Sequence, residues 1–187
     1  MLRTKDILDE KDPRVRAKNT DVDFPLNDEY KDIIPEMLKH LRYSQIEKLS
    51  KKYDLRPGMG LAAPQLGINK NFFVVCYEVK DGVFDDYILI NPKVISYSEE
   101  MIYAGEGEGC LSVNREVEGI VPRHARITVE AYDLDGNKRK YRVREDLAIA
   151  FQHELDHLNG ILFVDKIDKK DPFKGKDQMR EIWSFFI

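Results

Sequence analysis

The chain has 187 residues, a length that suits one folded domain with a sizeable core, and we expect residues 1–187 to form a single domain. Its composition, 42% hydrophobic and 34% charged, is ordinary for a globular protein, and the net charge of -4 is spread along the sequence, so it does not by itself indicate a nucleic-acid surface. No apolar run approaches the roughly 18 residues of a membrane span, the acidic N-terminus is unlike a signal peptide, and two cysteines are too few for a disulfide framework. We therefore expect a cytoplasmic protein without membrane contact.

The first third of the chain predicts helices. Asp12-Pro13 favours a turn followed by a short helix. Asn27 can cap a helix whose apolar residues recur on one face, with Pro35 either in its first turn or at a kink. Residues 44–47, Ser-Gln-Ile-Glu, have the pattern of a capping box and predict a second helix that ends near Tyr53.

A glycine-rich stretch comes next. Residues 58–63, Gly-Met-Gly-Leu-Ala-Ala, match the G-x-G-x-x-A pattern of dinucleotide sites. That pattern needs a strand before it and a helix after it, whereas Pro57 precedes this stretch and Pro64 blocks a following helix. The small residues instead allow the backbone to pass close to a site, where Gln65 supplies a side-chain amide.

The middle of the chain predicts strands. Residues 71–79 are a near-continuous β-forming run in which Cys76 is expected to be a core residue, and Asp81-Gly82 forms a turn. A further strand region spans residues 87–97, and Asn91-Pro92 interrupts its ladder.

A hairpin and a helix follow. Residues 126–133 alternate between apolar and polar, and Asp135-Gly136 joins them to a returning strand over residues 138–143. Residues 145–158 then predict a helix that Asn159-Gly160 ends. We expect a short strand over residues 161–164. The apolar tail, residues 183–187, is expected to pack on the body or extend a sheet edge, and binding of a partner is the alternative.

The predicted helix carries a metal-binding pattern, Gln152-His153-Glu154-Leu155-Asp156-His157. Two histidines four residues apart lie on one face of a helix, so both imidazoles can bind the same metal ion. Glu154 follows the first histidine, where a carboxylate can take a proton from a water on that ion.

Catalytic zinc-type sites use a third protein ligand and leave one position open. No histidine follows His157, and Glu181 is the downstream glutamate that could serve. Upstream, Cys110 lies in the Gly-rich segment Glu108-Gly109-Cys110-Leu111-Ser112, and a thiolate with two imidazoles suits Zn or Fe(II).

Three stretches taken together resemble one family. Residues 58–65, Gly-Met-Gly-Leu-Ala-Ala-Pro-Gln, residues 108–112, Glu-Gly-Cys-Leu-Ser, and residues 152–157 look like the three signature motifs of peptide deformylase, in that family's order. The resemblance extends from about residue 7 to residue 164, and the sequence around the motifs is similar to the type 2 branch. It implies an α+β fold in which antiparallel β-sheets surround the central HExxH helix, with additional N-terminal helices.

The resemblance also implies an activity: metal-dependent hydrolysis of the N-formyl group of N-formylmethionine at the start of newly made polypeptides. One divalent ion would be held by Cys110, His153 and His157; the family suggests Fe(II), which makes a thiolate site oxygen-sensitive, with Zn, Ni or Co as replacements. Glu154 would be the general base. Gln65 and the Leu111 backbone N–H would stabilise the oxyanion.

Further roles are expected around this centre. Met59, Gly60 and Gly109 match positions whose backbone binds the substrate as an added strand. Ile149 and Ala150, one turn before His153, are expected to line the pocket for the substrate methionine. We expect Asp156 to pair with Arg123 rather than to bind metal.

Two other functions are considered. An HExxH peptidase would use Glu181 as its third ligand, and a non-catalytic metal-binding homologue would need neither Glu154 nor Gln65. The partners expected are a formylated nascent peptide and, transiently, the ribosome, with no direct nucleic-acid specificity.

Overall fold

The computed structural model describes residues 1–184, and it has the expected α+β architecture. The helices are α1 (Asp28–Gln45), α2 (Glu47–Tyr53) and α3 (Glu145–Leu158). The strands are β1 (Gly60–Ala62), β2 (Phe72–Lys80), β3 (Val83–Tyr97), β4 (Met101–Ala104), β5 (Arg123–His124), β6 (Arg126–Tyr132), β7 (Lys138–Arg144) and β8 (Arg180–Ile182). One sheet has the order β1-β2-β3-β6-β7, with antiparallel neighbours throughout, and the other has the order β5-β4-β8. No helix within the described part of the chain meets the length and hydrophobicity that a membrane crossing requires.

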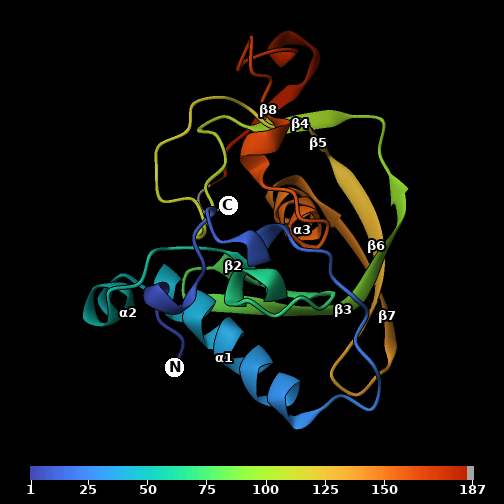
Figure 1. Cartoon of the computed structure of the whole chain (residues 1–187). Coiled ribbons are helices and arrows are strands. Elements are labelled where there is room, and N and C mark those ends of the chain that lie inside the picture. The colour runs from blue at the N-terminus through green and yellow to red at the C-terminus, as the bar shows by residue number, and fades with distance from the viewer. Residues whose placement is uncertain (185–187) are drawn as a thin grey trace.

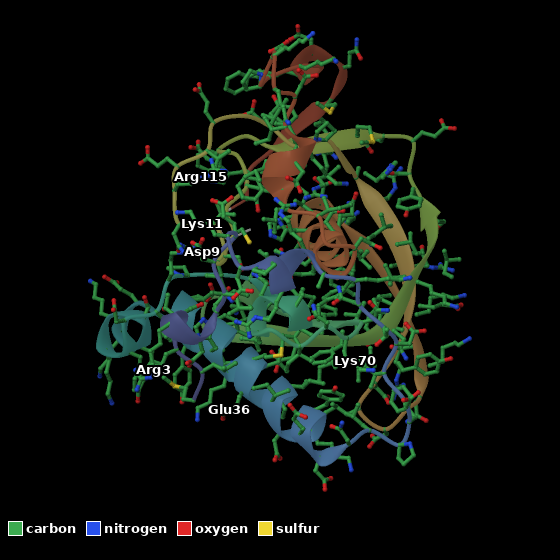
Figure 2. All side chains as sticks on the ribbon, viewed as in Figure 1. Arg3, Asp9, Lys11, Glu36, Lys70 and Arg115 are labelled. Carbon is green, nitrogen blue, oxygen red and sulfur yellow. The ribbon has the colours of Figure 1, made fainter. Side chains whose placement is uncertain are left out.

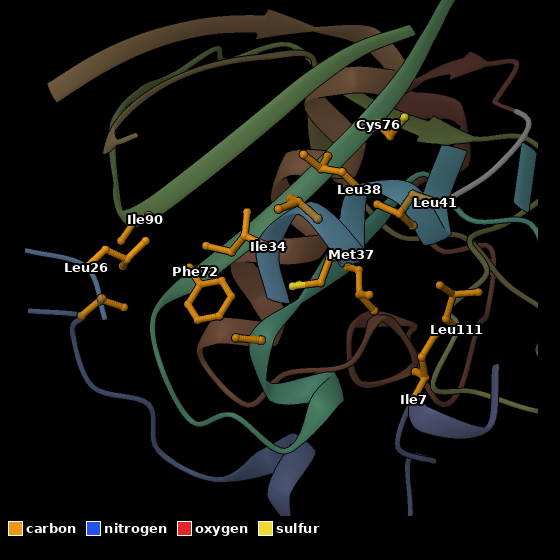
Figure 3. Packing of buried hydrophobic residues seen from close by; sticks show 14 residues of the cluster. Ile7, Leu26, Ile34, Met37, Leu38, Leu41, Phe72, Cys76, Ile90 and Leu111 are labelled. Atoms are coloured by element: carbon orange, nitrogen blue, oxygen red, sulfur yellow. The ribbon is translucent and has the colours of Figure 1, made fainter. Parts of the chain in front are cut away.

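The five-stranded sheet curves around α3, which is seen nearly end-on in Figure 1, and α1 lies on the other side of β2. Strand β2 is buried on both faces, as its continuous apolar run predicts. Phe72, Val74 and Cys76 pack with α1, whereas Phe73 and Val75 pack with α3. Figure 3 shows the first of these two cores, where Ile34 and Met37 of α1 lie near Phe72.

Helix α1 begins as predicted, because the Asn27 side chain accepts a hydrogen bond from the Tyr30 N–H at 2.9 Å. Pro35 lies inside this helix rather than at its start. The capping box predicted at residues 44–47 is wrong. Ser44 belongs to α1, where its buried hydroxyl donates to the Leu41 carbonyl, and Ile46 precedes α2 without a side-chain cap.

Strands β2, β6 and β7 follow the sequence pattern closely, whereas β3 begins at Val83 and not at residue 87 as predicted. Asp81 and Gly82 connect β2 to β3, and Asn91 interrupts β3 with a left-handed backbone (φ 51°) where the β3–β6 register shifts. In β6 the residues Ile127, Val129 and Ala131 are buried and face α3.

Near the end of the chain one prediction is wrong, and another falls partly outside the described residues. Residues 161–164 do not form a strand; Phe163–Lys166 is a 3-10 helix, because the Asp165 side chain accepts from the Leu162 N–H at 2.9 Å and turns the chain. Just before the apolar tail, β8 pairs in parallel with β4, and Trp183 is exposed. Residues 185–187 of the tail lie outside the described part of the chain.

The loop before β5 is tied to the N-terminal segment. Figure 2 shows Asp9 and Lys11 close to Arg115 on one side of the molecule. Asn114 donates to Asp9 at 2.7 Å, and Arg115 forms a two-pronged ion pair with Glu10. These contacts hold in place the loop that carries Cys110.

Candidate metal centre

Three candidate metal ligands meet beside α3. His153 and His157 project from one face of the helix, one turn apart, and Cys110 approaches from the loop after β4. Their ligand atoms all lie within 4.8 Å of one another, and Cys110 Sγ is 3.2 Å from His157 Nε2. All three side chains are buried. The set matches the Cys110, His153 and His157 group expected from the sequence.

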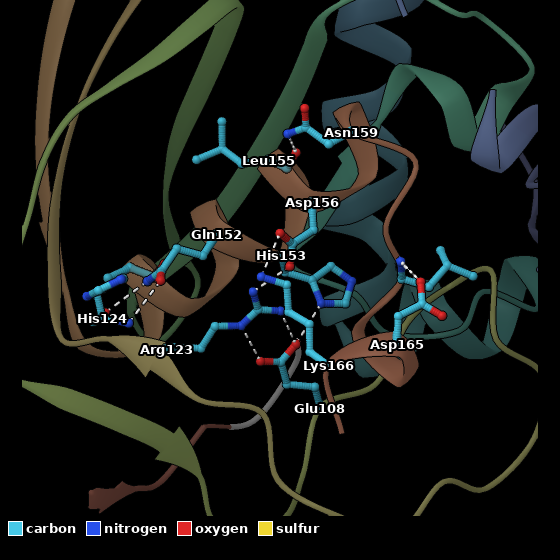
Figure 4. A network of polar contacts seen from close by, with 12 residues as sticks. Glu108, Arg123, His124, Gln152, His153, Leu155, Asp156, Asn159, Asp165 and Lys166 are labelled. Carbon is cyan, nitrogen blue, oxygen red and sulfur yellow. Dashed lines mark hydrogen bonds and ion pairs between the residues drawn. The ribbon is translucent and has the colours of Figure 1, made fainter. Parts of the chain in front are cut away.

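A buried charge network orients the first histidine (Figure 4). Glu108 accepts from His153 Nδ1 at 2.9 Å, which leaves Nε2 of that ring for the ligand cluster. Arg123 donates to both oxygens of Glu108, at 2.7 and 2.9 Å, and to Asp156 at 2.6 Å. Asp156 also pairs with Lys166 at 3.1 Å. The expected Arg123–Asp156 pair is therefore present, within a larger network.

The charges of this network are strongly coupled. Burial alone would raise the pKa of Glu108, but the Arg123 guanidinium and the His153 hydrogen bond lower it to about 2. Burial alone would lower the pKa of His153, yet Cys110 and Glu108 raise it well above its ordinary value. Two acidic groups thus surround one imidazole, so the cluster favours a positive charge at its centre.

Glu154 is buried without a neutralising partner. It is 3% exposed, and its Oε2 atom has no hydrogen-bond partner within the part of the chain that the structure describes. Burial raises its pKa to about 7. Gly60 lies against this carboxylate, since a Cβ atom built there would be 2.3 Å from Glu154 Oε1. Glu154 is therefore poised to exchange a proton near neutral pH.

Two polar donors lie beside Cys110. The Gln65 amide is fixed at both ends: Oε1 accepts from the Ala62 N–H at 2.9 Å, and Nε2 lies 3.1 Å from Ser112 Oγ and 3.6 Å from Cys110 Sγ. The neighbouring Leu111 N–H donates to no other residue among those described. Both groups belong to the segments that flank the ligand cluster.

A pocket of ≈ 170 Å³ opens onto these groups. Its lining includes Met59, Gly60, Gly109 and Ala150, which were expected to bind substrate. Ile149 is a correction: it packs with Ile102, Ala104, Ala125 and Ile182 instead of lining this pocket, because successive helical residues face different directions. Strand β1 forms one edge of its sheet, hydrogen-bonded to β2 alone among the described strands, so its other side can accept an added strand.

The residues present fit a divalent metal ion. A thiol and two imidazoles are a suitable donor set for Zn or Fe(II), and both imidazoles belong to a rigid helix. Burial, together with the positive charges near it, lowers the pKa of His157 well below its ordinary value, which favours the neutral form of this ring.

The alternative third ligand is excluded by position. Glu181 lies in β8, where it accepts from the Tyr103 hydroxyl at 3.0 Å, and it is not part of the ligand cluster. Cys76 is fully buried in the core beside α1, as predicted, and burial raises the pKa of its thiol to about 12.

Sequence reasoning gave no role to Glu108 or Arg56. The Arg56 guanidinium donates to the carbonyls of Cys110 and Val113 and to the Asn114 side chain, so it clamps the cysteine loop from the pocket side. Glu108 belongs to the same motif as Cys110, and this position in the motif was the one feature of the sequence that could have indicated a role for it. No sequence pattern marks Arg56, because its partners come close to it only when the chain folds.

Comparison with known proteins agrees with this geometry. The family model described as polypeptide deformylase matches residues 4–173. Peptide deformylases of Oceanobacillus iheyensis (47% identical, 92% of this chain and 94% of the relative) and Macrococcus caseolyticus (50%, 93% and 95%) are similar in sequence, as is peptide deformylase 2 of Bacillus cereus (44%, 97% and 99%).

Solved structures are similar over the same region. The crystal structure of a plant peptide deformylase has a TM-score of 0.73 at 28% identity, covering 92% of this chain and 85% of its own. A probable peptide deformylase from Synechococcus phage S-SSM7 has a TM-score of 0.69 at 34% identity, covering 86% and 97%. The chain belongs to the peptide deformylase family.

Proposed function

We propose that this protein removes the N-formyl group from the N-terminal methionine of newly made polypeptides, by metal-dependent hydrolysis that yields formate and a free amine. The observation that carries the proposal is the unpaired carboxylate of Glu154 beside the buried Cys110–His153–His157 cluster, in a pocket on the open edge of β1. A binding protein would have no use for a buried, uncompensated carboxylate, which is costly to maintain.

Cys110, His153 and His157 would hold one divalent ion. When bound, the ion supplies a Lewis acid that makes water a nucleophile at neutral pH and polarises the formyl carbonyl. The family resemblance favours Fe(II), and Zn, Ni or Co would fit the same donors. Glu108 orients His153, and the Arg123–Asp156 pair fixes Glu108 in turn.

Glu154 would act first as base and then as acid. Its pKa of about 7 lets it take a proton from the attacking water and deliver that proton to the leaving amine. The Gln65 side-chain amide and the Leu111 N–H would donate to the oxygen on which negative charge develops. Because Ala62 and Ser112 hold the Gln65 amide in place, its side chain would need little reorganisation during the reaction.

The substrate chain would bind along β1. Backbone groups of Met59, Gly60 and Gly109 would pair with the peptide as an added strand, which reads main-chain atoms rather than side chains. Ala150 would form part of the wall of the methionine pocket. Acting on newly made chains also implies a cytoplasmic location and a transient encounter with the ribosome.

A formate-release assay on formyl-Met-Ala-Ser, with anaerobic metal analysis of the same preparation, tests this proposal. Cys110→Ala should lose metal and activity together. Cys76→Ala removes the other thiol, which lies in the core beside α1, and should keep both. Metal retained in Cys110→Ala, or no formate from the metal-loaded wild type, would contradict the proposal.

A further inference from the structure

The guanidinium group of Arg56 binds the loop that carries Cys110 at three oxygen atoms. It donates to the backbone carbonyls of Cys110 and Val113, the second at 3.3 Å, and to the Asn114 side chain at 2.6 Å. Arg56 is half-buried and lies in the wall of the pocket that opens onto the ligand cluster. A planar guanidinium carries its N–H donors in a fixed fork, so it sets the direction of the oxygens that it binds. The Cys110 oxygen matters most, because it belongs to the peptide unit between Cys110 and Leu111.

This peptide unit is hydrogen-bonded at its oxygen and has no such bond at its nitrogen within the described part of the chain. The Cys110 carbonyl accepts from Arg56 and, at 3.1 Å, from the Val113 N–H, which closes a turn from Cys110 to Val113. A carbonyl oxygen has two lone pairs, so both are in use. At the other end of the unit, the Leu111 N–H donates to no described residue, and Leu111 lines the pocket. The N–H is therefore available to a substrate atom.

The peptide plane couples these two ends. Because the C–N bond has partial double-bond character, the carbonyl oxygen and the N–H lie in one plane and point in opposite directions. A charge-assisted hydrogen bond to the oxygen therefore aims the N–H, and the positive charge polarises the amide so that its N–H becomes a stronger donor. We propose that Arg56 is a positioning residue, which aims and polarises the Leu111 N–H for the oxygen that becomes negative during hydrolysis. This inference rests on the proposed function, since that reaction is what develops charge at the Leu111 N–H.

A second arginine holds the same loop without touching this peptide unit. Arg115 pairs with Glu10 at 2.7 and 3.2 Å, is exposed, and does not line the pocket. It lies toward the outside of the molecule (Figure 2). Removing either arginine loosens the loop, but only the loss of Arg56 leaves the Cys110 carbonyl without its charged donor. Arg115 is therefore a matched control that separates general support of the loop from orientation of the peptide.

Formate release from formyl-Met-Ala-Ser by the zinc-loaded proteins, with zinc content measured on the same samples, tests the inference. Arg56→Gln should keep zinc and KM and lower kcat about tenfold to a hundredfold, less than the about hundredfold to thousandfold cost of removing an oxyanion donor outright. Arg56→Lys should recover only part of this loss, because an ammonium group keeps the charge but not the fork. Arg115→Gln should change zinc content, KM and kcat little.

Two further measurements report on the peptide itself. The ¹H–¹⁵N resonance of the Leu111 amide, recorded without substrate, should move in Arg56→Gln and stay close to the wild-type position in Arg115→Gln. Millimolar guanidinium chloride should restore part of the kcat of Arg56→Ala, because the free ion can occupy the vacated place beside the Cys110 carbonyl. Sodium chloride at the same ionic strength should restore none, and neither salt should raise the kcat of Arg115→Ala.

Loss of zinc together with activity in Arg56→Gln would make this arginine a support of the ligand cluster alone. A higher KM at unchanged kcat would make it a group that only binds substrate. Equal kcat in the two glutamine variants, or an unmoved Leu111 resonance in Arg56→Gln, would remove its influence on the peptide. Each of these results overturns the inference while the wild type still releases formate. A zinc-loaded wild type that releases none would contradict the proposed function first, and this inference with it.

Discussion

Gly60 lies directly against the Glu154 carboxylate: a Cβ atom at residue 60 would come within 2.3 Å of Glu154 Oε1. This contact joins the edge strand to the proposed general base. It explains why the smallest residue stands at this position, because any side chain would displace the carboxylate.

We therefore expect Gly60→Ala to lower kcat about a hundredfold while the metal is retained, since moving a catalytic group by about an ångström costs this much. Gly105→Ala is a matched control, because its Cβ atom would come 2.4 Å from Glu181 Oε1, away from the site. That variant should lose stability and keep kcat. Steady-state kinetics and thermal unfolding distinguish the two, and equal kcat losses would contradict the explanation.

Glu154→Gln should keep the metal and reduce formate release by at least a hundredfold, because the amide cannot accept the proton of the attacking water. Metal content by elemental analysis and kcat by the formate assay are the measurements. Activity close to that of the wild type would remove Glu154 from the role of base.

Gln65→Leu should lower kcat about a hundredfold or more and change KM little, because the amide donates to charge that develops during the reaction. Ser112→Ala should give a smaller decrease in kcat, since Gln65 loses one of the groups that hold it. A rise in KM at constant kcat for Gln65→Leu would mean that the amide only binds the substrate.

Glu108→Gln should cost about 3 kcal/mol of unfolding free energy, because it leaves the buried Arg123 without its two-pronged partner. The affinity for metal should fall about tenfold to a hundredfold, since His153 loses the carboxylate that orients it. Urea unfolding and chelator competition measure the two effects. Glu106→Gln, an exposed glutamate two residues earlier, should change neither.

The Arg16–Asp165 pair predicts a pH dependence of stability. Arg16 donates to both oxygens of Asp165, at 2.7 and 3.1 Å, and holds the pKa of that carboxyl below its ordinary value. Its contribution is therefore present above the unfolded-state pKa of about 4 and is lost as pH falls through the lower, folded-state pKa.

Arg16→Gln should accordingly cost up to about 1 kcal/mol at pH 7, a modest value because both groups are partly exposed. The difference from the wild type should shrink as the pH falls below 4. Urea unfolding at both pH values is the measurement, and Lys18→Gln, an exposed neighbour, should show no such dependence. A cost that grows at low pH would contradict the assignment.

Local patterns predicted much of the fold. The asparagine cap of α1, the run of β2, the alternation of β6 and the pattern of α3 each depend on residues close together in sequence, so single stretches carry the information. Two predictions failed because a competing contact with a residue three positions away decides the local structure. Ser44 has a capping pattern, but a buried contact inside α1 uses its hydroxyl, and Leu162 would suit a strand until Asp165 caps it.

In the candidate site, too, some residues could be predicted from the sequence and others could not. Spacing along one helix predicts that His153 and His157 meet. The Gly-rich segment made Cys110 a candidate third ligand beside Glu181, and the family resemblance chose between them. Periodicity could have separated Ile149 from Ala150, since only one of two adjacent helical residues faces the pocket. The contacts of Arg56 and Glu108 join segments brought together by folding, so no local pattern predicts them.

The edge of β1 that pairs with no other described strand has a broader consequence. Peptide groups are the same in every polypeptide, so a partner held through them is accepted whatever side chains it carries beyond its first residue. Substitutions near the N-terminus of other proteins, beyond the first residue, would leave those proteins equally good substrates. A single small enzyme could in this way process the starts of very different proteins without evolving alongside any one of them.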